Sequence, residues 1–161
     1  MHRRELLRFS LGASLVLAGT SLVGCRAETA ATGYDILRDG DLPLLGALIP
    51  VVLAGTQATE TLVLHSLDHK LSALSPEMLK LTRQLFDVLS LPLTRGPLTG
   101  IWGAWEQASP AQVRAFLQRW QDSSLNLLRM GHASLLQLLQ MAWYERPESW
   151  AACGYPGPPK I

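Results

Sequence analysis

Apolar residues recur at helical spacing through the middle of the chain. Residues 42–55 (LPLLGALIPVVLAG) form a first apolar segment. We expect a helix there that is interrupted near Pro50, because proline lacks a backbone donor and clashes with the preceding turn. Residues 56–73 predict a second helix, since its leucines follow one another at intervals of three and four and so draw one stripe along a helix. These leucines are Leu64, Leu67, Leu71 and Leu74.

Two short polar segments have the composition of helix starts. Ser75-Pro76-Glu77 supplies an N-cap residue, a proline suited to the first helical position and an acid in the first turn. Ser109-Pro110-Ala111-Gln112 matches the same pattern and adds a glutamine at the third position, as a capping box requires. Residues 91–100 (LPLTRGPLTG), between these two helices, hold two prolines and two glycines and predict a loop.

Both starts are followed by apolar residues at helical spacing. The predicted apolar face after Ser75 consists of Met78, Leu81, Leu85, Phe86 and Leu89. The pattern after Ser109 runs through Val113, Phe116, Leu117 and Trp120, and then through Leu127, Leu128, Leu135, Leu136, Leu139 and Trp143. A break or kink is expected near Gly131. Since no segment alternates as a strand does, the chain predicts an all-α fold, a small bundle of about five helices.

The C-terminal segment departs from this helical pattern. Residues 154–160 (GYPGPPK) contain three prolines, which remove donors and fix φ. Pro156-Gly157 suits a type II turn, and the next two prolines favour an extended polyproline conformation that loses little entropy on docking. The bundle is therefore expected to carry an extended Pro/Gly-rich tail over residues 145–161.

The first 24 residues have the pattern of an export signal. A basic start containing Arg3 and Arg4 is followed by Leu6, Leu7 and an uncharged run over residues 9–23. This run is too short to span a membrane, which takes about 20 apolar residues. A paired arginine, two leucines and a weakly apolar run resemble a twin-arginine (Tat) signal. The alternative is the general secretory route, with the two arginines present by chance.

The end of this leader resembles a lipoprotein attachment site. Leu22-Val23-Gly24-Cys25 is similar to a lipobox, in which Cys25 is acylated and becomes the first mature residue. Residues 25–41 are polar and read as a tether, and residues 42–161 as the helical domain. No second long apolar run exists in the sequence, so we expect membrane attachment through lipid on Cys25. The predicted location is periplasmic and lipid-anchored.

The net charge and the few candidate reactive side chains limit the classes of function that this chain can have. The leader holds three of the 14 basic and one of the 13 acidic residues, which leaves an almost neutral mature chain with no basic footprint for nucleic acid. His65 and His69 lie four residues apart and suit a two-histidine metal site, but no third ligand is nearby and His132 joins only if the fold brings it there. Cys153, the remaining thiol, has no neighbouring base or second cysteine. No catalytic motif is recognised.

The five tryptophans allow two interpretations. Trp120 falls on the apolar stripe of its helix and is expected in the core. Trp102, Trp105, Trp143 and Trp150 lie near loops or the chain end, where large aromatic residues either anchor protein interfaces or pack against their own chain. The sequence leaves both interpretations open.

Residues 142–159 (AWYERPESWAACGYPGPP) resemble the C-terminal signature of the gluconate 2-dehydrogenase subunit 3 family. In that family an Ala-Trp-Tyr element leads through proline and a second tryptophan to Gly-Tyr-Pro-Gly-Pro. Chain length, leader and helical pattern agree with the family as well, whereas the lipobox departs from members whose leader is simply cleaved. The matching positions are Trp143, Tyr144, Trp150, Gly154, Tyr155, Pro156, Gly157 and Pro158.

The resemblance implies a non-catalytic small subunit of a periplasmic dehydrogenase. Such subunits carry the export signal for a large FAD-dependent subunit of the glucose-methanol-choline type, and a multihaem cytochrome c often accepts the electrons. The implied partners are therefore this flavoprotein, the Tat translocase and a cytochrome. FAD is expected in the partner, and no cofactor in this chain. The signature residues named above are expected to bind the partner.

Two other hypotheses remain. The chain is a stand-alone, lipid-anchored periplasmic lipoprotein that binds a small ligand or a metal through His65 and His69, or it has a minor redox role through Cys153.

Overall fold

The structure is a computed structural model that describes residues 29–158. Within this range the chain forms seven α-helices, one short 3-10 helix and no strand, so the all-α prediction is confirmed with somewhat more helices than the predicted five. Arg3, Arg4, Leu6, Leu7 and Cys25 lie outside the described residues. The elements are α2 (Leu42–Val52), α3 (Glu60–Ser72), α4 (Pro76–Ser90), α5 (Pro92–Thr99), η2 (Trp105–Gln107), α6 (Pro110–Gln121), α7 (Asn126–Tyr144) and α8 (Pro147–Cys153).

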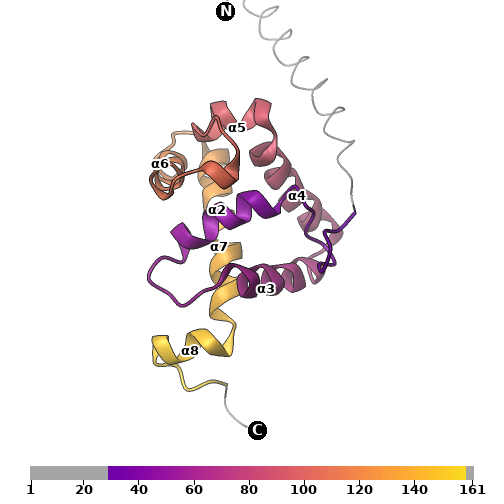
Figure 1. Cartoon of the computed structure of the whole chain (residues 1–161), viewed down its shortest axis with the longest axis vertical. Helices are drawn as coiled ribbons and strands as arrows, with labels where there is room; N and C mark the ends of the chain where they lie inside the picture. The colour runs from indigo at the N-terminus through magenta and orange to yellow at the C-terminus, as the bar shows by residue number, and fades with distance from the viewer. Residues whose placement is uncertain (1–28, 159–161) are drawn as a thin grey trace, which may run out of the picture.

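Helix α2 lies at the centre of the body (Figure 1) and packs against α3, α6, α7 and η2. Its buried residues Leu44, Leu45, Leu48 and Ile49 form one broad face. The other residues of α2 are partly buried except Pro50, as expected for a helix that has neighbours on several sides. The predicted interruption at Pro50 falls in the last turn, two residues before the helix ends at Val52. The helix continues through Pro50 for two residues, although the proline provides no backbone donor at that position.

Both predicted helix starts are confirmed. The Ser75 hydroxyl accepts a hydrogen bond from the Met78 amide at 3.3 Å. At the start of α6, the Ser109 hydroxyl accepts from the Gln112 amide at 3.3 Å, and the Ser109 amide donates to the Gln112 side-chain oxygen at 2.9 Å. This reciprocal pair is a complete capping box. Side-chain caps depend on a few neighbouring residues, so they are readable from the sequence.

Residues 91–100 are not the predicted loop, because residues 92–99 form α5. Pro92 occupies the start of the helix, where its missing N–H has no helical partner in any case. Gly100 ends the helix with φ +74°, the left-handed conformation that glycine adopts without penalty. A proline and a glycine in these positions delimit a helix rather than prevent one.

Helix α7 runs without a break through the predicted kink at Gly131. A Cβ built on Gly131 meets the Trp120 ring at 2.6 Å. The glycine therefore allows close contact between α6 and α7, and it does not mark a bend. Trp120 is fully buried and its indole N–H donates to the Leu98 carbonyl at 2.9 Å, so the prediction that it lies in the core is confirmed.

The second half of the predicted tether belongs to the packed body. Residues 31–41, here called the N-terminal strap, lie against α3 and α4, and Leu37 is as buried as the core leucines. The description of residues 25–41 as a tether is therefore corrected for residues 31–41. Their polar composition misled the prediction, because their backbone amides and charges are paired with buried side chains of the body. The buried residues of the strap are Ala31, Leu37, Arg38 and Asp41.

In residues 29–158, none of the helices has both the length and the apolar character that a membrane span requires.

Candidate partner-binding surface

The C-terminal signature divides into a buried part and an exposed part. Trp143 is only 3% exposed and belongs to the hydrophobic core. Its predicted role as a partner-binding residue is therefore corrected: it packs α7 into the body. Tyr144, the next residue, is 46% exposed. Adjacent residues of a helix point in different directions, so the Trp-Tyr pair places one ring in the core and one on the surface.

Residues 147–158 form a small unit, here called the C-terminal hook. Figure 1 shows its helix α8 at the far end of α7, and α8 packs against α7. The rings of Trp150 and Tyr155 meet edge to face at a centroid distance of 5.4 Å, and the Tyr155 amide donates to the Trp150 carbonyl at 3.0 Å. Gly157, with φ +96°, lies under the Trp150 ring.

The prediction of an extended tail over residues 145–161 is wrong in part, because the tail begins with the helix of the hook. Residues 147–153 are helical, because Pro147 suits the first position of a helix and Gly154 ends it with φ +67°. Pro156 and Pro158 are exposed, and so is half of the Tyr155 side chain. The hook therefore presents a pre-folded aromatic and proline surface, in which Trp150 supports Tyr155.

Glu145 fixes the base of the hook to α3. Its carboxylate accepts a hydrogen bond from the Ser66 hydroxyl at 2.7 Å and pairs with the Lys70 ammonium. Partial burial works to raise the pKa of Glu145, but the bonds from Lys70 and Ser66 outweigh it and lower that pKa below the ordinary value of 4.5. The charged form of Glu145 is therefore the one that holds α7 and α3 together.

The lowered pKa of Glu145 predicts a contribution to acid stability. Because the folded-state pKa lies below the unfolded value, this contribution is present above about pH 4.5 and is lost as the pH falls through the folded pKa. We expect Glu145→Gln to reduce stability at pH 6 and to make stability less dependent on pH below about 4.5. Urea unfolding at several pH values measures this, with Glu106→Gln as an exposed control. Parallel pH profiles for Glu145→Gln and the wild type would contradict the assignment.

A groove between α4 and α7 exposes large apolar side chains. It encloses about 370 Å³ and is here called the α4/α7 groove. Small or polar residues, among them Ala73, Thr82 and Ser134, lie between larger apolar ones such as Met78 and Met141. The remaining lining residues are Lys70, Leu74, Gln137 and Leu138.

Exposed apolar residues continue from this groove along both helices. Leu81 follows Met78 by one turn of α4, and Met130 and Leu127 lie one and two turns before Ser134 on α7. Five large side chains of these two helices, Met78, Leu81, Leu127, Met130 and Met141, are between 49% and 76% exposed. Such a concentration of apolar side chains on a small body is typical of a protein interface.

Met78 and Leu81 were predicted on the buried face of α4, and that prediction is wrong, because both are exposed. The buried face of α4 is formed by Phe86 and Leu89 together with polar residues such as Thr82 and Asp87. On α4 a buried aspartate that pairs with an arginine takes a position in the core, so the apolar residues and the buried residues do not coincide. The sequence does contain one indication of this, because α4 has more apolar residues than one face of the helix can bury.

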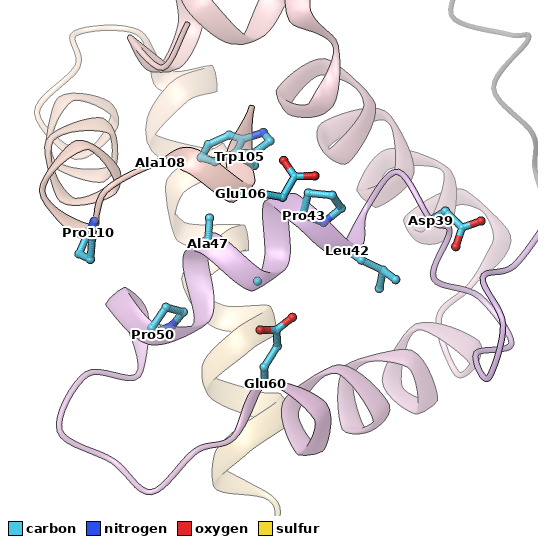
Figure 2. Close-up of a pocket in the computed structure, with 11 residues that line it drawn as sticks. Asp39, Leu42, Pro43, Ala47, Pro50, Glu60, Trp105, Glu106, Ala108 and Pro110 are labelled. Carbon is cyan, nitrogen blue, oxygen red and sulfur yellow. The ribbon is translucent and has the colours of Figure 1, made fainter. Parts of the chain in front are cut away.

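A second cavity of about 590 Å³ lies between α2, η2 and the start of α3 (Figure 2). Its wall is apolar, and three carboxylates surround it, those of Asp39, Glu60 and Glu106. Glu60 reaches over α2 at Gly46, where a Cβ would meet its carboxylate at 2.9 Å. No serine, cysteine, histidine, lysine or arginine is among the residues that line it, so it offers negative charge and apolar surface. The apolar lining residues include Leu42, Pro43, Ala47, Pro50, Trp105, Ala108 and Pro110.

The candidate metal ligands do not converge in the described residues. His65 stacks on Tyr34 with a ring-centroid distance of 4.9 Å, and His69 is exposed. In the range 29–158, no group of three His, Cys, Asp or Glu side chains is arranged to hold a metal ion. His132 is half-buried on α7, where burial lowers its pKa. Cys153 is a free, exposed thiol at the end of α8.

The remaining tryptophans are divided between core and surface. Trp105 is buried, and its indole N–H donates to the Leu89 carbonyl at 2.8 Å. Trp102 is 76% exposed, although one face of its ring lies against Gly96. Trp150 is half-buried within the hook. Of the four tryptophans left open by the sequence, Trp105 and Trp143 are core residues, whereas Trp102 and Trp150 are accessible to a partner.

Comparison with family models gives no match to this chain, and comparisons with curated proteins and with solved structures give no match either.

Proposed function

We propose that this chain is a non-catalytic small subunit that binds, exports and stabilises a large FAD-dependent dehydrogenase of the glucose-methanol-choline type. The observation that carries the proposal is the α4/α7 groove with its continuation, which leaves five large apolar side chains uncovered. Methionine-rich surfaces adapt their shape to a partner. The resemblance of residues 142–159 to the small-subunit signature supplies the identity of that partner.

The leader supports the same proposal. Tat export is required when a protein must fold around its cofactor before it crosses the membrane. The chain offers no recognised cofactor motif of its own, so the need for this route belongs to the cargo that it binds. In the proposed mechanism the flavoprotein takes up FAD in the cytoplasm and binds this chain, and the two cross together. Acylation of Cys25 then holds the complex at the periplasmic side of a membrane, where a multihaem cytochrome c accepts electrons.

The C-terminal hook is the second proposed contact. Tyr155, Pro156 and Pro158 form an exposed rigid edge, so binding through them costs little conformational entropy. The hook and the α4/α7 groove are joined by α7, since Met141 lines the groove and Tyr144 lies one turn further along. One partner surface that follows α7 therefore contacts both.

Charged substitutions in the groove test this proposal. We expect Met78→Asp with Met141→Asp to weaken binding of the flavoprotein about tenfold or more, because each substitution places a charge in an apolar contact. The measurement is the amount of flavoprotein that co-purifies with the tagged chain from solubilised membranes. Leu93→Asp is the matched control, because Leu93 is an exposed leucine on α5. Equal recovery with all three proteins would show that the groove does not bind the partner.

The stand-alone lipoprotein is the second candidate function, and the cavity in Figure 2 favours it. Three carboxylates around an apolar wall suit a small cationic ligand. Titration of the purified chain with organic amines, followed through tryptophan fluorescence, tests this alternative. Saturable binding that is lost in Glu60→Gln, together with no co-purifying flavoprotein, is the result that favours the alternative.

A further inference from the structure

The N-terminal strap is held to α3 by one buried carboxylate. Asp68 accepts hydrogen bonds from three consecutive backbone amides, those of Asp35, Ile36 and Leu37, at 2.8, 2.9 and 2.7 Å. Asp68 is only 6% exposed. Three charge-assisted bonds from one carboxylate fix the backbone of the strap more firmly than apolar contacts alone.

Four further contacts act on the same segment. Arg38 of the strap pairs with Asp87 of α4 at 2.8 Å and with Asp41 at 2.9 Å, and all three side chains are buried. Tyr34 stacks on His65 of α3. The Ala31 amide donates to the Leu37 carbonyl at 2.7 Å and closes the loop between them. The strap is thus part of the folded body from residue 31 onward.

Anchoring at residue 31 shortens the free chain between the lipid site and the body. An extended chain spans at most about 3.3–3.6 Å per residue, so Cys25 lies within about 20 Å of Ala31. If the whole predicted tether were free up to Leu42, the reach would be about 56–61 Å. The difference is larger than the thickness of a typical bilayer core, which is about 30 Å.

We propose that the strap and the adjacent part of α3 form the face of the protein that lies against the lipid headgroups. This inference rests on the proposed acylation of Cys25 and adds an orientation to it. The exposed residues of the strap are Thr32, Gly33, Asp35 and Asp39, and none of them has an apolar side chain, so this face lies on the headgroup layer and does not insert into it. Figure 1 shows α8 far from the strap, so the C-terminal hook is directed away from the membrane toward the partner.

Quenching of a fluorophore by lipids with a nitroxide headgroup tests this orientation. The acylated full-length chain is inserted into vesicles of phosphatidylethanolamine and phosphatidylglycerol, labelled either at the native Cys153 or at Thr32→Cys with Cys153→Ser. Thr32 is an exposed residue of the strap itself. We expect quenching at position 32 to be at least threefold stronger than at position 153. Equal quenching at the two positions overturns the proposal.

Two variants lengthen the free chain in different ways. Asp68→Ala removes the acceptor of the three strap amides, and a ten-residue Gly/Ser insertion after Thr29 leaves the body unchanged. We expect both to bring the quenching ratio toward one, and Asp122→Ala, an exposed control, to leave it as in the wild type. If Asp68→Ala fails to fold, the insertion alone decides. An unchanged ratio with the insertion overturns the proposal.

Hydrogen exchange tests whether the strap is anchored to the body, independently of whether Cys25 is acylated. We expect the amides of residues 35–37 to be protected in the wild type and to exchange at least tenfold faster in Asp68→Ala. Lack of protection in the wild type overturns the inference, even when mass spectrometry finds acyl chains on Cys25. Protected amides on a chain without acyl groups refute the lipid anchor of the proposed function instead, and the membrane-facing orientation is overturned with it.

Discussion

Replacing Arg3 and Arg4 by lysine is expected to strand the flavoprotein partner in the cytoplasm. Lysine keeps the positive charge but lacks the planar, forked guanidinium that bidentate recognition uses. The substitution therefore separates a requirement for paired arginines from a requirement for a basic leader. The measurement is FAD-dependent dehydrogenase activity in periplasmic and cytoplasmic fractions, and we expect the periplasmic share to fall to about a tenth or less of its wild-type value.

Arg8→Lys is the control for this experiment, because it alters a third arginine of the same leader outside the pair. An unchanged distribution of the flavoprotein in the double variant would refute the escort role. An unchanged distribution of this chain alone, with the flavoprotein absent from the periplasm in every strain, would indicate the general secretory route.

The second large effect is expected from Arg38→Met. Arg38 lies between the buried carboxylates of Asp41 and Asp87. Removing the arginine leaves buried negative charge without compensation, which typically costs about 3–5 kcal/mol. We expect a loss of this size in the free energy of unfolding, measured by urea denaturation with an unchanged slope.

A double variant distinguishes charge from packing at this position. Arg38→Met with Asp87→Leu removes the uncompensated carboxylate on α4, while Asp41 still accepts the Arg38 backbone amide. We expect the double variant to be more stable than Arg38→Met alone. If Arg38→Met costs less than about 1 kcal/mol, the buried ion pairs do not fix the strap.

The parts of the fold that the sequence predicts correctly depend on neighbouring residues. The caps at Ser75 and Ser109 need only three or four consecutive side chains, and both form as expected. The core positions of α6 follow from helical spacing, since Val113, Phe116 and Trp120 are buried. These features are local, so the chain itself contains the information.

The parts that were missed depend on contacts between distant residues. The strap is fixed by Asp68 and Asp87, which lie more than 30 residues further along the chain, and nothing in its polar sequence indicates a buried position. The buried face of α4 was predicted wrongly, because a buried aspartate occupies a core position where an apolar residue was expected. The α5 helix was missed because all four prolines and glycines were counted as helix breakers, whereas Pro92 begins the helix, Gly100 ends it, and Gly96 and Pro97 lie within it.

The candidate site shows the same division. The C-terminal signature drew attention to Tyr155 and Pro156, and the structure leaves both exposed. The signature could not show that Trp143 is a core residue, because the burial of Trp143 depends on the packing of α7 against the remaining helices. The α4/α7 groove was not predicted, since no sequence pattern distinguishes an apolar residue of the core from one that awaits a partner.

Native mass spectrometry of the tagged wild-type chain, extracted from membranes in mild detergent, tests the central claim most directly. We predict one dominant species with the mass of this chain, one larger subunit and one FAD. A dominant species with the mass of the acylated chain alone, from cells that contain the flavoprotein, would contradict the claim that this protein acts as a subunit.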